Sequence, residues 1–483
     1  MARATVVGSG PNGLTAAVAL ARSGYDVTVI EAASAPGGGL RTSGVTLPGF
    51  RHDVCSAVHP AALASPVFRA IGLDRRIDWI RPDASYAHPL DGGRAAIAWR
   101  DIDRTAEGLG ADGRAWYAML RPLMQRIEGV VEATGDQLLR VPRDPIAAAR
   151  FGLRMLEAGS VLGRHTFRTE AADALLTGVM AHANAPLPSP AAAAAGLLLA
   201  AHGHAGGWAY PRGGAQAIAD ALVAQVMAHG GRVETSHRVS NLAALDWGDP
   251  AAGDLLVLDA PPRLVLTLPD VPPRYARALR RYRYGTAAAK VDFALDGPVP
   301  WRHPEVALSP TVHVGGTRAA IEASENAVAH GRVSDRPYVL AVQPSVLDDS
   351  RAPRGKAVLW AYIHVPHGSP LDPTERVIRQ IERFAPGFRD RILAAHAVPA
   401  ARREAANPSE IGGDVFGGAF TMAQAVRRPV VSRTPWRTPV RGVYLASAAT
   451  PPGPGVHGMA GWHAARMALR DAGLPDALTD VFA

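Results

Sequence analysis

The sequence predicts an α/β protein that combines a parallel sheet of the Rossmann type with a second region of antiparallel sheet and helices. Three observations lead to this fold class. A glycine-rich strand–helix–strand pattern opens the chain, residues 76–204 have helical periodicity, and short strand-like runs separated by turns follow residue 263. Because 483 residues exceed the size at which one hydrophobic core stops growing, we expect two or three domains.

The composition is that of a folded protein with an ample core. Hydrophobic residues make up 48% of the chain and charged residues 19%, which excludes wholesale disorder. The formal net charge is +8, and the basic residues are almost all arginine, since Lys290 and Lys356 are the only lysines. The arginines are scattered among alanine, glycine and proline and do not form runs, so we expect no nucleic-acid partner.

The cysteine content and the longest apolar run indicate in which cellular compartment the protein lies. Cys55 is the only cysteine, which excludes an intramolecular disulfide, a cysteine-rich zinc site and a cysteine-ligated iron–sulfur cluster. The first strand begins near residue 4 and leaves no room for a signal peptide, so we expect a cytoplasmic protein. The longest apolar run, residues 190–203, is shorter than the ~20 residues of a spanning helix. We expect a core helix there, with peripheral contact to a membrane surface as the alternative.

The opening stretch, ATVVGSGPNGLTAAVALARSGYDVTVIE, has the pattern of a strand, a helix and a second strand. Gly8, Gly10 and Gly13 have G-x-G-x-x-G spacing, and Gly24 fits the end of the helix. We expect Gly8 to allow the tight turn, Gly10 to let a pyrophosphate approach, and Gly13 to allow close packing of helix and strand. Glu31 ends the second strand, where its carboxylate can accept from both ribose hydroxyls. The pattern predicts a dinucleotide site, which NAD and FAD both fit.

A second glycine turn distinguishes the two dinucleotides. Gly37 and Gly38 follow six and seven residues after Glu31, and Arg41 and Thr42 come next. In two-domain flavoproteins such a turn lets the chain run along the pyrophosphate and ribityl groups, whereas a simple dehydrogenase does not need it. The turn therefore favours FAD over NAD, and the alternative is an ordinary glycine-rich loop.

Several stretches spread over the whole chain share a further pattern. They are the N-terminal unit, the Gly-Gly turn with LPGFRHDVCSAVHP, GWAYPRGGAQAIADAL, KVDFAL, NPSEIGGDVFGG and GVYLASAATPPGPGVHGMAGWHAARMAL. Together they resemble phytoene dehydrogenase-like FAD-dependent oxidoreductases, a family that includes carotenoid desaturases and isomerases. The sequence departs from the commoner pattern at Gly39, where many relatives carry arginine, and we expect Arg41 to serve instead.

The C-terminal stretch has the pattern of a buried strand, a rigid Pro/Gly turn and a helix that ends at Gly473. A helix N-terminus carries roughly half a positive elementary charge and free N–H groups. The resemblance implies that this turn lies against the isoalloxazine ring, where the helix would stabilise anionic reduced flavin, and that Val239 holds the adenine through its backbone. The residues expected to bind FAD are Gly8, Gly10, Pro11, Asn12, Gly13, Glu31, Gly37, Gly38, Gly39, Arg41, Thr42, Val239, Gly455, Val456, His457, Gly458 and Met459.

His457, Lys290 and His59 are the candidate catalytic side chains. His457 belongs to the turn expected at the ring. Lys290 lies on a predicted strand, on the same face as Ala288 and Asp292. Its ammonium group either points into the flavin cavity, where it would hold a water at N5 or polarise a substrate carbonyl, or extends to solvent.

His59 shares the segment that the resemblance places beside the flavin with His52 and Cys55. The three side chains could form a metal site, but no second thiol is available and we expect no metal. Packing and covalent attachment of the flavin are the remaining alternatives for this segment.

The predicted domains are discontinuous. Residues 1–75, 205–262 and 405–483 are expected to build the FAD-binding domain, with a helix over residues 215–229 and a parallel strand over residues 233–239. Residues 76–204 should form a helical cap. Residues 263–404 should form a substrate-binding domain, in which AAAKVDFAL, YVLAVQP and KAVLWAYIHVP are strands of an antiparallel sheet below the cavity.

These features predict a two-domain flavoprotein that dehydrogenates or desaturates an apolar or largely neutral small molecule by hydride transfer to flavin N5. Redox-neutral isomerisation on reduced flavin is the second hypothesis. Amine oxidation comes third, because the aromatic cage and the C-terminal flavin-binding acid common in that group are not evident. A flavin-binding protein without turnover is the alternative from another class. Substrate identity, electron acceptor and oligomeric state have no signature in the sequence.

Overall fold

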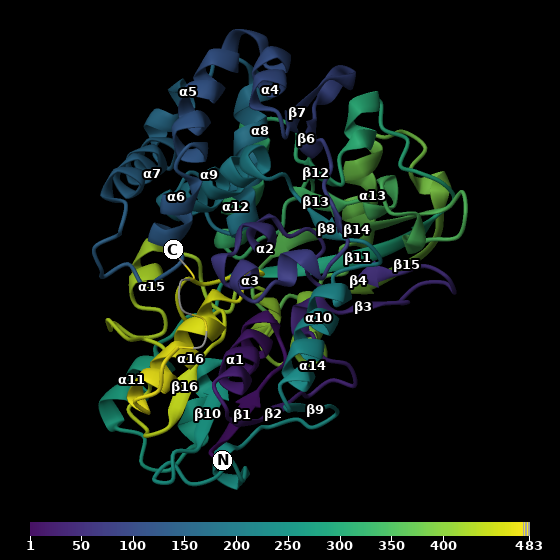
Figure 1. Cartoon of the computed structure of the whole chain (residues 1–483). Helices are drawn as coiled ribbons and strands as arrows, with labels where there is room; N and C mark the ends of the chain where they lie inside the picture. The colour runs from purple at the N-terminus through teal and green to yellow at the C-terminus, as the bar shows by residue number, and fades with distance from the viewer. Residues whose placement is uncertain (477, 479–480, 482–483) are drawn as a thin grey trace.

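The computed structural model describes residues 1–476, 478 and 481, and two large sheets organise this part of the chain (Figure 1). The first sheet has five parallel strands in the order β16-β10-β1-β2-β9. Its strands are β1 (Arg3–Val7), β2 (Asp26–Ile30), β9 (Arg232–Glu234), β10 (Leu255–Leu258) and β16 (Val443–Leu445). The Rossmann-type sheet is confirmed. The strand expected over residues 233–239 ends at Glu234, so Val239 lies in the loop that follows it.

Helices cover both faces of the parallel sheet. Packed on one face are α1 (Pro11–Arg22), α10 (Gln216–Ala228) and α16 (Met459–Asp471). Gly461 sets the crossing of α16 and α1, because a Cβ at this position would lie 1.9 Å from the Asn12 carbonyl oxygen. The other face carries a 3-10 segment (Pro262–Thr267) and α11 (Pro273–Arg280). Residues 263–280, expected in the substrate domain, therefore pack with the parallel sheet.

The second sheet has seven strands in the order β15-β11-β14-β13-β12-β6-β7. They are β6 (Ala84–Pro89), β7 (Ala95–Trp99), β11 (Ala287–Leu295), β12 (Thr311–Val314), β13 (Val339–Val342), β14 (Ala357–Val365) and β15 (Ile392–Val398). The three predicted strands are β11, β13 and β14. The sheet is mixed and not purely antiparallel, because β12 and β6 pair in parallel. Two of its strands, β6 and β7, come from the segment expected in the helical cap.

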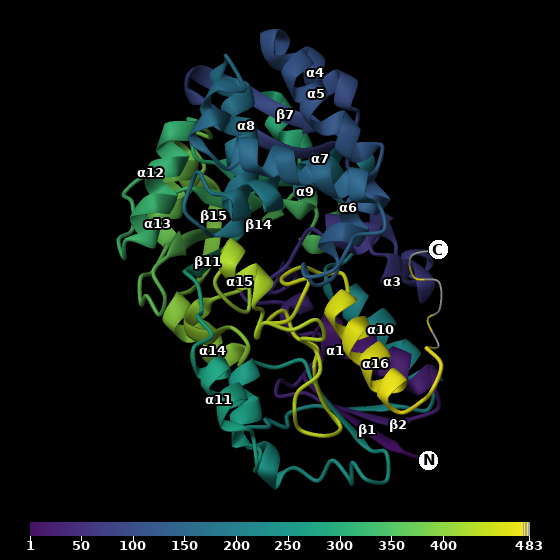
Figure 2. The same ribbon diagram turned by 90° about the vertical axis from the view of Figure 1, so that its left-hand side faces the viewer.

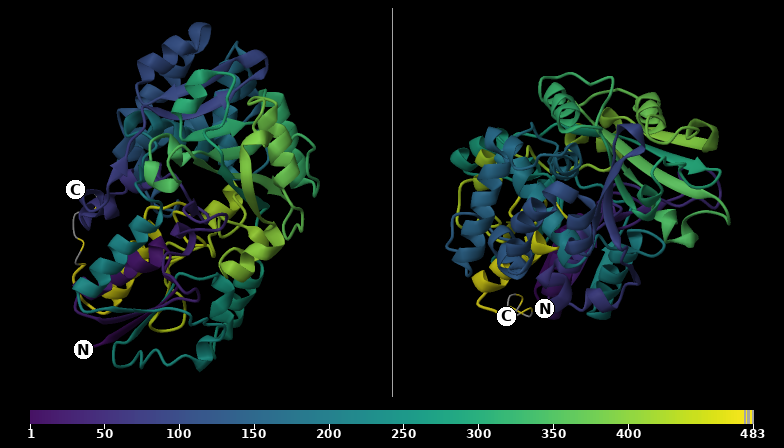
Figure 3. Two further views of the ribbon diagram at one scale, coloured as in Figure 1. Left: turned by 90° about the vertical axis from the view of Figure 1, so that its right-hand side faces the viewer. Right: turned by 90° about the horizontal axis from the view of Figure 1, so that it is seen from above.

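After β7 that segment forms the expected helices, which lie on one side of the second sheet (Figures 2 and 3). They are α4 (Ile102–Gly108), α5 (Gly113–Met124), α6 (Ile127–Thr134), α7 (Pro145–Ala158), α8 (Glu170–Met180) and α9 (Pro190–Ala205), with α12 (Arg318–Ala329) against α8. The opposite face of the sheet is covered by α13 (Thr374–Glu382).

Helix α9 is a core helix, as the sequence predicts, because no residue from 190 to 204 is exposed. Only its last residue, Ala205, is exposed, and peripheral contact of the protein with a membrane surface stays a prediction. No helix in the described part of the chain is long and apolar enough to span a bilayer.

Short elements connect the two sheets. They are the β3 (Thr42–Ser43) and β4 (His52–Asp53) pair, the β5 (Trp79–Ile80) and β8 (Tyr210–Pro211) pair, and helices α2 (Pro60–Ala64), α3 (Pro66–Ala70), α14 (Ala400–Ala406) and α15 (Met422–Val426).

Candidate functional site

One cavity of about 1200 Å³ extends from the glycine-rich loop after β1 to the face of the second sheet. Gly10 and Glu31 line one end, and Lys290, Trp360 and Tyr362 line the other. Ordinary pockets for single small ligands measure roughly 300–1,000 Å³, so this cavity has room for more than one such molecule. It connects the dinucleotide motif with the sheet that was expected to form the floor of the substrate site.

The glycine-rich loop admits no side chain at its three signature positions. Gly8 has a φ of +97°, in the left-handed region that favours glycine. A Cβ at Gly13 would lie 2.1 Å from the Gly8 carbonyl oxygen, and one at Gly10 would lie 2.5 Å from a carboxylate oxygen of Asp259. The loop is therefore closed to side chains, as a pyrophosphate-binding turn requires. Pro11 and Asn12, in the first turn of α1, line the cavity together with Gly8 and Gly10.

Glu31 stands just past the end of β2 with only 7% of its surface exposed. One carboxylate oxygen accepts from the Ala33 amide at 2.8 Å, and the other accepts from the Ser9 amide at 3.0 Å and from the Ser9 hydroxyl. These bonds fix the carboxylate at the cavity wall and leave acceptor capacity for ribose hydroxyls. Val239, in the loop after β9, lines the same end.

The second glycine turn lies directly against the first. Gly37 and Gly38 both have positive φ, and a Cβ at Gly38 would lie 3.1 Å from the Gly10 Cα atom. Gly38, Gly39 and Arg41 line the cavity, whereas Gly37 does not. Arg41 donates to the carbonyl oxygen of Gly38 at 3.0 Å, so its guanidinium is held at the turn.

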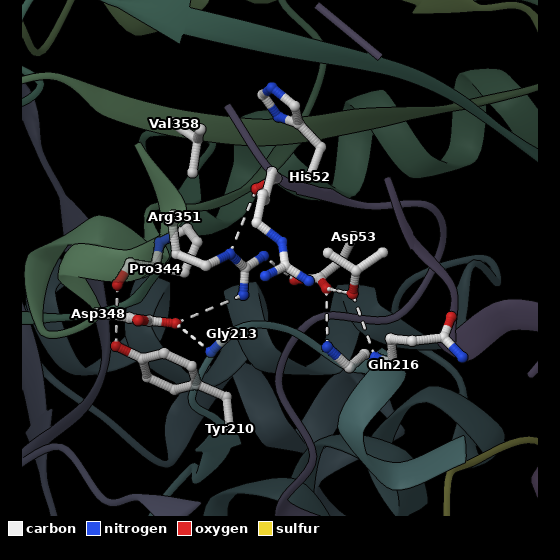
Figure 4. A network of polar contacts seen from close by, with 12 residues as sticks. His52, Asp53, Tyr210, Gly213, Gln216, Pro344, Asp348, Arg351 and Val358 are labelled. Carbon is white, nitrogen blue, oxygen red and sulfur yellow. Dashed lines mark hydrogen bonds and ion pairs between the residues drawn. The ribbon is translucent and has the colours of Figure 1, made fainter. Parts of the chain in front are cut away.

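Thr42, expected to bind the cofactor, does not line the cavity and is hydrogen-bonded into a polar network. Figure 4 shows Asp53, Gln216, Asp348 and Arg351 of this network. The Thr42 hydroxyl donates to Asp53 at 2.7 Å and accepts from the Gln216 amide at 3.1 Å. Asp53 also accepts from Arg351 at 2.5 Å, and Arg351, which is 1% exposed, lies 3.8 Å from the Asp348 carboxylate. The network joins β4 and the start of α10 to the loop before β14, so Thr42 helps to hold the two sheet regions together.

The C-terminal turn reaches the cavity through Gly455, Val456, His457 and Met459. Gly458 does not line it. With a φ of +68°, Gly458 is the residue before α16, and a Cβ there would lie 2.5 Å from a side-chain oxygen of α1. Gly458 therefore has a role in packing α16 on α1, and its contact with the ring stays a prediction.

The His457 side chain is hydrogen-bonded to the start of α16. Its Nδ1 accepts from the Met459 amide at 3.1 Å, so that amide is not free for another acceptor. The His457 carbonyl accepts from the Ser65 hydroxyl at 2.6 Å. Burial lowers the pKa of His457 to about 4, which keeps the imidazole neutral near pH 7. Because Nδ1 accepts from the Met459 amide, the proton of the neutral ring is on Nε2, which can donate a hydrogen bond, and the ring supplies no charge.

Lys290 does not extend to solvent. It lies on β11, is 2% exposed, and donates from Nζ to Asp292 at 2.6 Å. Burial lowers the pKa of Lys290. Burial also acts to raise the pKa of Asp292, but the Lys290 ammonium and neighbouring donors outweigh it, so this pKa falls below its ordinary value. The ammonium also stands 5.5 Å from the centre of the Trp360 ring. The sequence left open whether the Lys290 side chain extends to solvent or lies at the cavity, and the structure places it in the cavity wall.

His59 and Cys55 also line the cavity, whereas His52 does not. Burial lowers the pKa of His52 and of His59 to about 4 and raises that of Cys55 to about 12, so all three side chains are neutral near pH 7. His59 contacts the Ser56 hydroxyl through Nδ1 at 3.2 Å. Within residues 1–476, 478 and 481 no three His, Cys, Asp or Glu side chains are placed to hold a metal ion.

Several lining residues were not predicted. Asp259 follows β10 and stands inside the glycine-rich loop, His182 and Arg403 come from segments that the motifs do not mark, and Glu410 lies in NPSEIGGDVFGG without having been singled out. Asp259 had a recognisable signal, since LLVLDAPP is a buried strand whose carboxyl end meets the same sheet edge as β1 and β2. His182 and Arg403 had none, because their positions depend on how the cap and the segment after β15 pack.

Comparison with known proteins agrees with this geometry. A family model described as flavin containing amine oxidoreductase matches residues 12–468. The chain is 25% identical to pyridine nucleotide-disulfide oxidoreductase domain-containing protein 2 of Rattus norvegicus over 97% of this chain and 93% of that protein. It is 27% identical to phytoene dehydrogenase of Streptomyces griseus over 80% of this chain and 77% of that protein.

Solved structures show the same fold. An oxidoreductase from Methanosarcina mazei superposes with a TM-score of 0.61 at 15% identity, covering 97% of this chain and all of the other. A triple mutant of putrescine oxidase superposes with a TM-score of 0.60 at 17% identity, covering 98% of each chain. At such identities the structures establish the α/β architecture with its parallel and mixed sheets.

Proposed function

The chain belongs to the flavin-containing amine oxidoreductase family, and from this membership we propose that it is an FAD-dependent enzyme that dehydrogenates or desaturates a largely apolar, uncharged small molecule. One observation carries the proposal. A single cavity joins a glycine-rich dinucleotide motif to an apolar sheet face, and the only ammonium side chain in that cavity wall is already paired with a carboxylate.

The described residues fit FAD at one end of the cavity. Glu31 is held where it can accept from ribose hydroxyls, the loop of Gly8, Gly10 and Gly13 packs so closely that a Cβ would collide with neighbouring protein atoms, and Arg41 is held at the second glycine turn. Val239 and the turn of Gly455 to Met459 would contact the adenine and ring ends. When bound, FAD supplies the acceptor for a hydride.

The other end of the cavity favours a neutral substrate. Phe151, Met155, Leu198, Leu340 and Val342 line it. Charges there are compensated within the protein, since Lys290 is paired with Asp292 and Arg403 with Glu410 at 2.6 Å. A charged substrate would lose its hydration without gaining an unpaired partner from these groups.

Lys290 is the strongest of the three catalytic candidates, because it is the one that brings a charged donor to the cavity wall. We assign it the task of holding a water or polarising a substrate oxygen while Asp292 fixes its orientation. The neutral imidazoles of His59 and His457 remain candidates as hydrogen-bond partners, with His457 restricted by its bond to the Met459 amide.

Amine oxidation is the competing function, and one observation favours it. The rings of Trp360 and Tyr362 stand edge to face with centroids 5.2 Å apart in the cavity wall, and the Trp360 ring already faces the Lys290 ammonium. Aromatic faces attract alkylammonium groups. Redox-neutral isomerisation differs from both functions in leaving the flavin redox state unchanged after turnover.

Anaerobic flavin bleaching with matched compounds separates these functions. The purified yellow protein is mixed with polyenes, lipids and cyclic precursors, and with amines of the same carbon skeleton. We expect a neutral compound to bleach the flavin, and Lys290→Met to slow bleaching at least tenfold with equal flavin content. Bleaching by amines alone would replace the proposal with amine oxidation. Product formation only after prior flavin reduction, with no net bleaching, would replace it with isomerisation.

Absence of bound flavin from the purified protein would overturn the whole assignment.

NADPH serves as a further control. No second glycine-rich strand–helix–strand pattern follows residue 40 in the sequence, so we expect NADPH to leave the flavin oxidised for minutes.

A further inference from the structure

An acid stands inside the loop that is expected to receive the pyrophosphate. Asp259 directly follows β10, and one of its carboxylate oxygens accepts from the Gly13 amide at 2.8 Å. Cβ atoms built at Gly8, Gly10 and Gly13 would all lie within 3 Å of Asp259 atoms. The glycines of the signature motif therefore pack around this side chain, and Gly8 and Gly10 also line the cavity.

Asp259 takes the place of a capping residue for α1. The residue before the helix is Gly10, which has no side chain that could accept from the first amides. Asp259 supplies such an acceptor from another strand, at the end of the helix where negative charge is stabilised. This is also the position that attracts phosphate groups at the start of such helices.

The surroundings of Asp259 oppose its ionisation despite the helix. Burial raises its pKa to about 7, the Gly13 amide lowers it, and the Glu31 carboxylate raises it again. Arg238 and Arg263 line the same cavity, but Arg263 is bound to Glu404 at 2.6 Å, and neither arginine is among the groups that shift Asp259. The carboxyl group is thus poised to change charge close to neutral pH.

We propose that the protonation state of Asp259 controls how tightly the protein holds FAD, with the neutral acid admitting the pyrophosphate and the ionised carboxylate competing with it for the start of α1. The inference rests on the proposed function, in which the dinucleotide is FAD. The neutral carboxyl keeps one oxygen as acceptor for the Gly13 amide and offers an O–H to a phosphate oxygen. The ionised form places a negative charge beside the two charges of the pyrophosphate.

The sign of the pH effect follows from linkage. Pyrophosphate favours the protonated acid, so the pKa of Asp259 is higher with FAD bound than without it. FAD affinity is then constant below about pH 7 and falls above it, because binding must take up a proton there. Between about pH 6 and pH 8.5 we expect the dissociation constant to rise tenfold or more.

The experiment dilutes flavin-loaded protein into buffers at about pH 6 and about pH 8.5 and follows the fluorescence of released FAD. Wild type is expected to release FAD at least tenfold more readily at the higher pH, whereas Asp259→Asn holds it equally at both. Asp414→Asn is the matched control. Asp414 is another buried carboxyl in the cavity wall, and its variant should keep the wild-type pH dependence.

Equal retention of FAD by wild type at both pH values would overturn the inference, and so would an Asp259→Asn variant with the wild-type pH dependence. If Asp259→Asn does not fold, the wild-type measurement decides alone. A protein that carries no FAD at any pH contradicts the proposed function. FAD retained equally at both pH values contradicts only the role of Asp259.

Discussion

The two ends of the cavity differ in how burial shifts the pKa of their ionisable groups. At the glycine-rich end these are the carboxyl groups of Glu31 and Asp259, and burial raises the pKa of Asp259 to about 7. At the sheet and cap end the side chains of His182 and His202 line the cavity, and burial lowers their pKa to about 3 and about 4. Burial favours the uncharged form in both cases, so it acts on acids and bases in opposite directions.

The comparison shows how each end recognises its ligand. The glycine-rich end offers backbone amides and a helix N-terminus, which suit phosphate. In our proposal the protonation state of Asp259 sets the pH range in which phosphate binds there. The sheet end offers aromatic and aliphatic side chains, neutral imidazoles and a compensated ion pair, which suit an uncharged molecule. Lower pH should therefore strengthen the first end and weaken the second.

The largest expected effect is at the ion pair of the sheet end. Lys290→Met removes the partner of Asp292 and leaves its carboxylate buried without a counter-charge. We expect the free energy of unfolding to fall by about 3–5 kcal/mol, measured by urea titration. Lys290→Met combined with Asp292→Leu should recover most of this loss, because the uncompensated charge is then removed. A single variant as stable as wild type would show that the two groups are not a buried ion pair.

The next effect is at the glycine-rich end. Gly10→Ala places a Cβ 2.5 Å from the Asp259 carboxylate, and we expect flavin affinity to fall about a hundredfold or more, measured as flavin retained after gel filtration. Gly44→Ala is the control outside the cavity. Its Cβ would lie 3.5 Å from the Phe50 carbonyl oxygen, an ordinary contact, and flavin should be retained. If both variants retain flavin equally, the first glycine-rich loop does not require glycine at position 10 for flavin binding.

Acid should destabilise the sheet and cap end. His88, His202 and His204 stay neutral when folded but take up protons below about pH 6.5 when unfolded, so stability falls between about pH 6.5 and pH 4. Each histidine contributes up to about 1.4 kcal/mol per pH unit in that window. Urea midpoints measured at several pH values check the slope, which His202→Phe should reduce. A midpoint that rises on acidification would contradict these directions.

The smallest effect concerns Thr42, which joins the two regions. Thr42→Val removes the bonds to Asp53 and to the Gln216 amide, so we expect a loss of about 1 kcal/mol in unfolding free energy. Because Thr42 does not line the cavity, flavin content should not change. Loss of flavin at wild-type stability would return Thr42 to the cofactor site.

The sequence predicts the glycine-rich end well because backbone geometry determines it. Gly8, Gly10 and Gly13 have few alternatives once a strand and a helix flank them, and Glu31 follows at a fixed distance along the second strand. The parallel sheet, helix α1 and the strands β11, β13 and β14 were therefore predictable from local pattern alone.

The sheet end is less predictable because long-range pairing builds it. Strands β6 and β7 join the second sheet through a parallel contact between Ala87 and Val312, which no local periodicity marks. Thr42 was assigned to the cofactor from its position in the turn, although the direction of its side chain depends on Asp53 eleven residues later. Whether Lys290 faces solvent or the cavity depends on the cap that covers its strand.

A crystal structure of the flavin-loaded protein tests the central claim most directly, namely that one cavity holds the dinucleotide at its glycine-rich end and an uncharged substrate at its sheet end. We predict electron density for FAD with the ribose at Glu31, the adenine at Val239 and the ring between Lys290 and the turn that contains Gly455 and Val456. Density that leaves the glycine-rich loop empty, or that places the ring at Glu31, would contradict the account.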